Sequence, residues 1–136
     1  TPMNTPRLLI AAIVMMLAGA AANSADKPTR AEKNEAKLAA MLKDRTAGEP
    51  VSCVPALKSN GLQVIEGVAM VYDSGDVLYV SRPTHANMLR DDDIIVIERT
   101  GGQLCNTDII RTIDRTGGFH TGVVFLGKFV PYRKQR

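Results

Sequence analysis

The sequence predicts a mainly β protein, in which a small antiparallel sheet curls into a barrel or a sandwich and one amphipathic helix precedes it. Three observations favour this fold class. From residue 51 onward the hydrophobic segments are short, as strands are, and number about five or six. Most turns between them contain glycine. No helical pattern separates one segment from the next, which argues against a parallel α/β fold.

Residues 1–22 have the pattern of a secretory signal peptide. Arg7 supplies the positive charge, residues 8–17 form an unbroken apolar run, and small residues follow up to Ala22. This order is typical of a cleavable signal peptide. The alternative is a membrane anchor, but a spanning helix needs about 20 apolar residues and this stretch is shorter. We therefore expect cleavage after Ala22, or after Ala20, and a periplasmic or secreted protein without a stable membrane anchor.

Residues 23–50 predict a polar leader followed by an amphipathic helix. Thr29 and Glu32 have the spacing of a capping box, in which each side chain bonds the backbone of the other residue. Gly48 and Pro50 are expected to end the helix. A narrow apolar stripe runs along one side of this charged helix, which carries Ala31, Glu35, Leu38 and Leu42, with Ala39 and Met41 beside them. We favour docking of this stripe on the chain's own β domain, and contact with a partner is the alternative.

Residues 51–136 are expected to form the β domain. Gly67 is interpreted as a bulge or bend within a strand, and residues 73–76 as the loop of a hairpin. Pro131 is expected to end the last strand. The expected strands cover residues 51–57, 62–72, 77–82, 94–99, 108–114 and 121–130.

The hairpin around residues 73–76 has two apolar faces. If Tyr72 pairs with Val77, then Met70 lies opposite Tyr79, and these four side chains share one face. A hairpin at the surface would expose one polar face, so this one is expected to be central, or to be covered by the helix or by another chain. The face of Met70, Tyr72, Val77 and Tyr79 is therefore a candidate interaction face. The opposite face carries Ala69, Val71, Leu78 and Val80.

Cys53 and Cys105 are the only cysteines. In an oxidising compartment an even count favours a disulfide. Closing a loop of about 50 residues contributes about 4 kcal/mol in the chain-entropy description. Two buried free thiols remain an alternative. A metal site built on the pair is less favoured, because the sequence contains no C-x-x-C motif.

Several segments of the β domain together resemble a known group of proteins. They are Cys53-Val54-Pro55, the hairpin Gly67-Val68-Ala69-Met70-Val71-Tyr72 with Leu78-Tyr79-Val80, Arg82-Pro83, Leu104-Cys105, and Phe129-Val130-Pro131-Tyr132-Arg133. Over residues 50–133 the chain resembles a family of small exported proteins of unknown function from Gram-negative bacteria. The resemblance implies export and a β domain with paired cysteines, and it assigns no activity.

Charge and composition narrow the functional classes. The formal net charge is +3, and Arg7 contributes one of these charges. That excess is too small to indicate nucleic-acid binding. Glycines lie between strands and do not open helices, so no phosphate cradle and no cofactor is expected. We expect a non-catalytic periplasmic binding or structural module, whose partner is another envelope protein or a second copy of the chain.

Two further hypotheses remain open, although we assign no catalytic and no metal-binding residue. A small exported hydrolase would use His85 or His120 beside a carboxylate and a hydroxyl. A metal carrier would gather both histidines with Cys53 and Cys105, which are widely spaced. The carboxylates of residues 91–93 lack the spacing of a calcium loop and are interpreted as a solvated turn. A concave site containing either histidine or this acidic cluster would decide between the hypotheses.

Overall fold

The computed structural model describes residues 26–55, 61–99 and 101–136, so the expected signal peptide lies outside the described part of the chain. These residues form one α-helix and several antiparallel strands, which confirms a mainly β fold with a preceding helix. The elements are α1 (Arg30–Met41), β1 (Arg45–Ala47), β2 (Cys53–Pro55), β3 (Leu62–Ile65), β4 (Ala69–Asp73), β5 (Val77–Ser81), the 3-10 helix η1 (Ala86–Met88), β6 (Ile94–Glu98), β7 (Gln103–Cys105), β8 (Ile109–Ile113), β9 (His120–Val124) and β10 (Phe129–Lys134).

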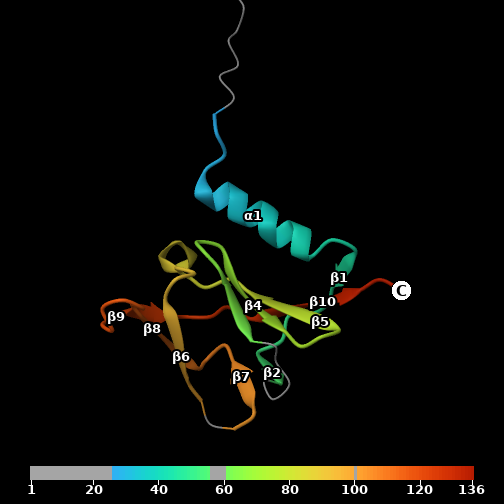
Figure 1. The fold of residues 1–136 in the computed structure, drawn as a ribbon. Coiled ribbons are helices and arrows are strands. Elements are labelled where there is room, and N and C mark those ends of the chain that lie inside the picture. The colour runs from blue at the N-terminus through green and yellow to red at the C-terminus, as the bar shows by residue number, and fades with distance from the viewer. Residues whose placement is uncertain (1–25, 56–60, 100) are drawn as a thin grey trace, which may run out of the picture.

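The strands of the described ranges form three antiparallel sheets. The main sheet has five strands in the order β1-β10-β5-β4-β3, β6-β8-β9 form a three-stranded sheet, and β2 pairs with β7 alone. In the described residues these ladders do not close into a barrel. Helix α1 lies along one side of the main sheet, and the β2–β7 pair lies on the opposite side (Figure 1). The main sheet is therefore covered on both faces.

Helix α1 begins at the expected capping box. The Thr29 hydroxyl accepts a hydrogen bond from the Glu32 N–H at 3.2 Å, and the Glu32 carboxylate accepts one from the Thr29 N–H at 2.6 Å. Leu38 is only 1% exposed, and Met41 and Leu42 pack beside it against the main sheet. The expected docking of the helix on its own domain is confirmed.

The helix ends earlier than expected. Its last residue is Met41, ahead of Gly48 and Pro50. Asp44 takes a left-handed conformation with φ of 61°, which reverses the chain into β1. Strand β1 then pairs with β10, so the main sheet includes residues that precede the expected start of the β domain at residue 51.

The hairpin of β4 and β5 has a different register from the one expected. Tyr72 pairs with Tyr79 and not with Val77. The Asp73 carboxylate accepts a hydrogen bond from the Gly75 N–H at 2.8 Å, and Gly75 has φ of 93°. This turn extends the loop past residue 76, so Val77 pairs only with Arg133 of β10. Because the shift is two residues, the two faces keep their expected parity.

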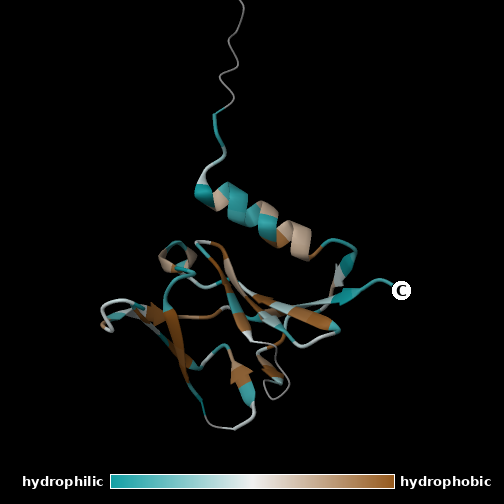
Figure 2. Cartoon of the chain, viewed as in Figure 1, coloured by the Kyte–Doolittle hydropathy of each residue, from teal (hydrophilic) through white to brown (hydrophobic). Residues whose placement is uncertain are grey.

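Each face of this central hairpin belongs to a separate hydrophobic cluster. Val71 and Val80 face α1 and Leu38, as expected for the second face. Met70 and Tyr72 face the opposite way and pack with Phe129, which is fully buried. Figure 2 shows hydrophobic colours along β5 and β6, whereas most of α1 is hydrophilic. Both apolar faces are therefore covered within the chain.

The expected strand over residues 62–72 is a hairpin. Gly67 has φ of 71°, which suits the third position of a type II turn. The Val68 N–H donates to the Ile65 carbonyl at 3.0 Å and closes that turn. Gly67 thus lies in a full reversal between β3 and β4, and the expectation of a bulge or bend within one continuous strand was wrong.

The expected strand over residues 121–130 is also two strands. Between β9 and β10 the backbone of Gly127 approaches Arg82, and a Cβ at this position would lie 2.6 Å from the Arg82 carbonyl oxygen. Pro131 does not end β10 but lies inside it. Its carbonyl accepts from the Gly48 N–H at 2.7 Å, so its missing N–H faces the side where β1 has already ended.

Candidate functional site

The expected disulfide is present. Cys53 lies directly opposite Cys105 in the β2–β7 ladder, with the two Cα atoms 4.0 Å apart, and their sulfur atoms are bonded. The neighbouring residues Val54 and Leu104 point into the core and are at most 1% exposed. The bond excludes the free-thiol and metal-ligand alternatives for this pair in the oxidised protein. A structural disulfide fits an oxidising compartment.

The candidate interaction face lies mostly inside the protein. Met70, Tyr72 and Val77 are buried, and Tyr79 is half-buried. The rings of Tyr72 and Tyr79 pack at 6.4 Å between centroids, which is a normal aromatic contact within a sheet. Three of its four side chains are therefore core residues and offer no exposed surface to a partner.

The two histidines are exposed and do not form a site together. His85 precedes η1, and His120 begins β9 beside a shallow depression that includes Arg111 and Val123. Within the described ranges, neither imidazole makes a hydrogen bond or an ion pair, so the triad of a hydrolase is not formed there. The same residues contain no group of three potential metal ligands. Among the helices that the structure describes, none is long and apolar enough to cross a membrane.

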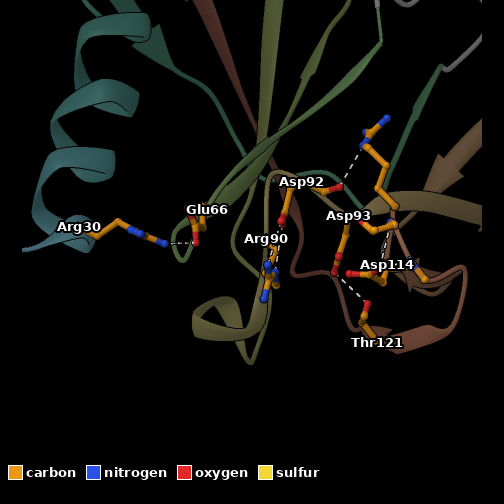
Figure 3. Close-up of polar contacts among 10 residues, drawn as sticks. Arg30, Glu66, Arg90, Asp92, Asp93, Asp114 and Thr121 are labelled. Carbon is orange, nitrogen blue, oxygen red and sulfur yellow. Dashed lines mark hydrogen bonds and ion pairs between the residues drawn. The ribbon is translucent and has the colours of Figure 1, made fainter.

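A groove of about 600 Å³ opens where the first turn of α1 meets the β3–β4 turn and the segment around η1. This volume falls within the usual range for small-ligand sites. Asp93 precedes β6 and Thr121 belongs to β9, and both line the groove. Figure 3 shows these two side chains turned toward each other. The lining residues are Arg30, Ala31, Glu66, Gly67, Asn87, Met88, Leu89, Arg90, Asp93 and Thr121.

Asp93 is the unusual group of this groove. The residue is only 6% exposed, although carboxylates are rarely buried without a partner. Its Oδ2 accepts a hydrogen bond from the Thr121 hydroxyl at 2.8 Å. The oxygen of Thr121 lies 2.7 Å from the hydroxyl of Thr112, which completes a chain of three polar side chains. The second oxygen, Oδ1, is buried and has no hydrogen-bond partner in the described residues.

Burial of Asp93 corrects the prediction of a solvated acidic turn. Asp91 and Asp92 are exposed as expected, but Asp93 points inward. Asp91 and Asp92 lie in a turn, whereas Asp93 directly precedes β6, where side chains alternate in direction and Ile94 points outward, so Asp93 points inward. No local signal identified its partner, because Thr121 lies 28 positions away and reaches Asp93 through the pairing of β9 with β8.

The arginines near Asp93 are already engaged by other carboxylates. Arg90 makes a two-point contact with Asp92, at 3.0 and 2.8 Å, and this hydrogen bonding raises the pKa of Arg90 and lowers the pKa of Asp92. Arg30 pairs with Glu66 at 2.9 Å (Figure 3), and both residues line the groove. Neither guanidinium donates a hydrogen bond to Asp93.

Two further charged groups lie beside the acidic segment. The Arg115 Nε donates to the backbone oxygen of Asp92 at 3.1 Å. The Asp114 carboxylate accepts from the Thr116 N–H at 2.9 Å and from the Gly117 N–H, so it caps its own turn.

Comparison with protein-family models, with curated proteins and with solved structures finds no match to this chain. The groove therefore has to be interpreted from its own chemistry.

Proposed function

We propose that this chain is a non-catalytic binding module of the Gram-negative cell envelope, exported to the periplasm or beyond, and that the groove at Asp93 holds its ligand. The observation that carries the proposal is the buried Asp93 carboxylate, of which one oxygen lacks a partner in the described residues. Leaving a buried polar atom unsatisfied costs about 1–3 kcal/mol. Such a cost is typical of binding sites, where strain or unmet polar groups are retained for function.

Export is supported by the disulfide and by the pattern of residues 1–22. Cell fractionation with mass spectrometry tests it. We expect a chain shortened at its N-terminus, located outside the cytoplasm, in which Cys53 and Cys105 resist alkylation until a reductant is added. An intact chain in the cytoplasm with both thiols alkylated would contradict export.

Binding at the groove is tested by an NMR screen of chemically diverse small fragments against the oxidised protein. We expect hits that shift the amide signals of Gly67, Leu89 and Thr121, which line the groove. The signals of Thr46 and Ala47, in β1, serve as an internal control because they are far from that lining in the fold. Hits distributed evenly over the surface would show that the groove is not a binding site.

A second candidate role, association with a further copy of this chain, is favoured by the outer face of the three-stranded sheet. Ile94, Ile109 and Val123 are each 41–49% exposed there. Their strand neighbours point into the core, so this face has no cover in the described part of the molecule. Glu98 and Arg111 form an ion pair at 3.1 Å on the same face. One charge of each sign makes the face self-complementary under a two-fold axis.

Sedimentation of the protein at increasing concentration tests self-association. We expect a dimer that Val123→Lys abolishes, because an ammonium group would be buried without a partner. Lys128→Ala, at an exposed position after β9, is the control and should leave the dimer intact. A protein that stays monomeric at all concentrations would exclude this second role.

We further propose that the main sheet and the two smaller sheets pack as a β-sandwich. Support comes from the larger hydrophobic cluster, which receives Met70 from the main sheet, Leu104 from the β2–β7 pair and Ile110 from the three-stranded sheet. A sandwich needs side chains from two facing layers in one core, and a cluster shared by all three sheets supports this arrangement. An experimental structure of the oxidised chain tests the layering.

A further inference from the structure

We propose that the group bound in the groove is an ammonium or a guanidinium at the end of an apolar stem, and that Asp93 receives it. This inference rests on the proposed binding function and specifies its chemistry. The same chemistry is offered by a free small amine and by a lysine or arginine side chain of a polypeptide. The argument has three steps, which concern the hydrogen bonds, the charge and the shape of the groove.

The hydrogen bonds define what the ligand must supply. Asp93 Oδ2 is occupied by the Thr121 hydroxyl. That hydroxyl has one proton, so when it donates to Asp93 the 2.7 Å contact with Thr112 uses the Thr112 proton, which otherwise reaches the Gly122 carbonyl at the longer distance of 3.3 Å. Oδ1 can only accept while the carboxylate is ionised. An N–H donor from a ligand is the missing complement, and a charged donor forms the stronger bond.

The charges around the groove also favour a positively charged ligand. Arg30 is paired with Glu66, and Arg90 with Asp92. Asp114 and Arg115 add one further charge of each sign beside the acidic segment. Asp114 caps its own turn and is partly exposed, so Asp93 is the one buried carboxylate of this set that takes part in no ion pair in the described residues. Arg90 lies within Coulombic range of Asp93, but its donors point to Asp92. A ligand cation would restore the balance.

The shape of the groove suits an apolar stem. Leu89 is 2% exposed and Met88 is 65% exposed, so the η1 segment presents one buried and one free apolar side chain beside Asp93. Methionine adapts its shape to varied ligands because its side chain is unbranched and flexible. A volume of about 600 Å³ accommodates a stem of four carbons with room to spare. An inorganic cation is less suited, because three potential metal ligands do not gather in the described residues.

The test compares probes of similar chain length on the unchanged, oxidised protein by NMR titration. The probes are n-butylamine and n-butylguanidine as cations, n-butanol as the neutral analogue and butyrate as the anion. We expect saturable shifts of the Gly67, Leu89 and Thr121 amides with the two cations, and affinities at least about tenfold weaker for the alcohol and for butyrate. The tripeptide acetyl-Gly-Arg-Gly-amide distinguishes the sources, because tighter binding than n-butylguanidine indicates a polypeptide side chain and weaker binding indicates a free amine.

Two variants connect the preference to Asp93. Asp93→Asn should weaken cation binding about tenfold or more, because the charge-assisted bond is lost. Asp91→Asn is the matched control: it removes the same charge from the same loop, but its side chain is exposed, and we expect less than a twofold change. The amide spectrum of each variant reports whether it is folded, and the probe comparison on the unchanged protein requires no variant.

The outcomes separate this inference from the binding function. Equal binding of the amine and the alcohol, or tighter binding of butyrate through Arg30 and Arg90, would overturn the cation assignment while the groove remains a binding site. Fragments that bind elsewhere on the protein, or loss of cation binding in both aspartate variants alike, would overturn the role of Asp93 itself.

Discussion

The two faces of the main sheet are covered in different ways. One face packs on side chains from the β2–β7 pair and the three-stranded sheet, and the pair is held by the disulfide of Cys53 and Cys105. The other face is covered by α1, which buries Leu38 fully and Met41 and Leu42 in part. The helix is also tied by surface pairs, such as Arg82 with Glu35 at 2.7 Å.

This difference indicates where the stability of the fold is located. A two-stranded pair of three residues per strand is not stable alone, so its place in the core depends on the covalent bond and on the burial of Val54 and Leu104. Helix α1, in contrast, contributes one fully buried side chain, Leu38. It can therefore detach at a lower cost than global unfolding. The groove lies at the first turn of that helix, so ligand binding and helix docking should be coupled.

The largest expected effect is loss of the disulfide. Replacing Cys53 and Cys105 with alanine should lower the free energy of unfolding by about 4 kcal/mol, because a loop spanning 52 positions is no longer closed in the unfolded chain. Denaturant unfolding of the two forms measures this difference. Reduction of the unchanged protein is the control and should give a similar loss. A loss below about 1 kcal/mol would show that the face covered by the β2–β7 pair does not depend on the disulfide for its stability.

Shortening the main helix anchor should have the next largest effect. Leu38→Ala removes the one fully buried side chain of α1 and should cost about 3 kcal/mol. Hydrogen exchange should show faster exchange of the α1 amides, while Met70 and Ile110 keep their protection. Lys37→Ala, which is exposed on the same helix, should change stability by less than about 0.5 kcal/mol. Equal loss of protection in helix and core would mean that α1 unfolds only with the whole domain.

On the disulfide-linked side of the main sheet, the Gly127 backbone lies close to Ser81 and Arg82. Ser81 is fully buried and its hydroxyl donates to the Gly127 carbonyl at 2.7 Å. Gly127→Ala places a methyl group against the Arg82 carbonyl oxygen and should cost about 2 kcal/mol in thermal or denaturant unfolding. Gly122→Ala is the matched control, because its nearest neighbour, the Thr112 hydroxyl oxygen, would lie at an ordinary 3.6 Å. Equal stability of the two variants would show that a methyl group at position 127 does not clash with the Arg82 carbonyl oxygen.

The comparison also separates what local sequence can predict from what it cannot. The capping box of Thr29 and Glu32 is a contact over three positions, and the sequence predicted it correctly. The disulfide followed from the cysteine count together with the expected compartment. The apolar pattern predicted which side chains of the β4–β5 hairpin share a face. It did not predict the register, because the Asp73 turn decides the pairing.

Long-range contacts account for the remaining errors. The break before β10 arises where Gly127 meets Arg82, 45 positions earlier in the sequence. Burial of Asp93 depends on Thr121, which becomes its neighbour only after β9 pairs with β8. An aspartate ahead of a strand is an ordinary turn residue, so composition and periodicity give no reason to single it out. The candidate site therefore could not be predicted from the sequence, because it depends on contacts that only the folded three-stranded sheet makes.

The smallest expected effect is the pH dependence of the helix contact between Glu35 and Arg82. The Arg82 hydrogen bond lowers the pKa of Glu35 in the folded state. A carboxyl group with a lowered folded pKa stabilises the fold above its ordinary pKa of 4.5, and this contribution is lost as the pH falls through the folded value. Both side chains are at least half exposed, so the contribution should stay below about 1 kcal/mol.

Glu35→Gln should therefore reduce stability slightly at neutral pH and not at all in acid, whereas exposed Glu49→Gln should show no such trend. Denaturant midpoints measured across this pH range provide the readout. A loss at Glu35 that persists in acid would mean that the side chain packs against the sheet rather than acting through its charge, and the helix-covered face would then be held by more than Leu38 and surface pairs.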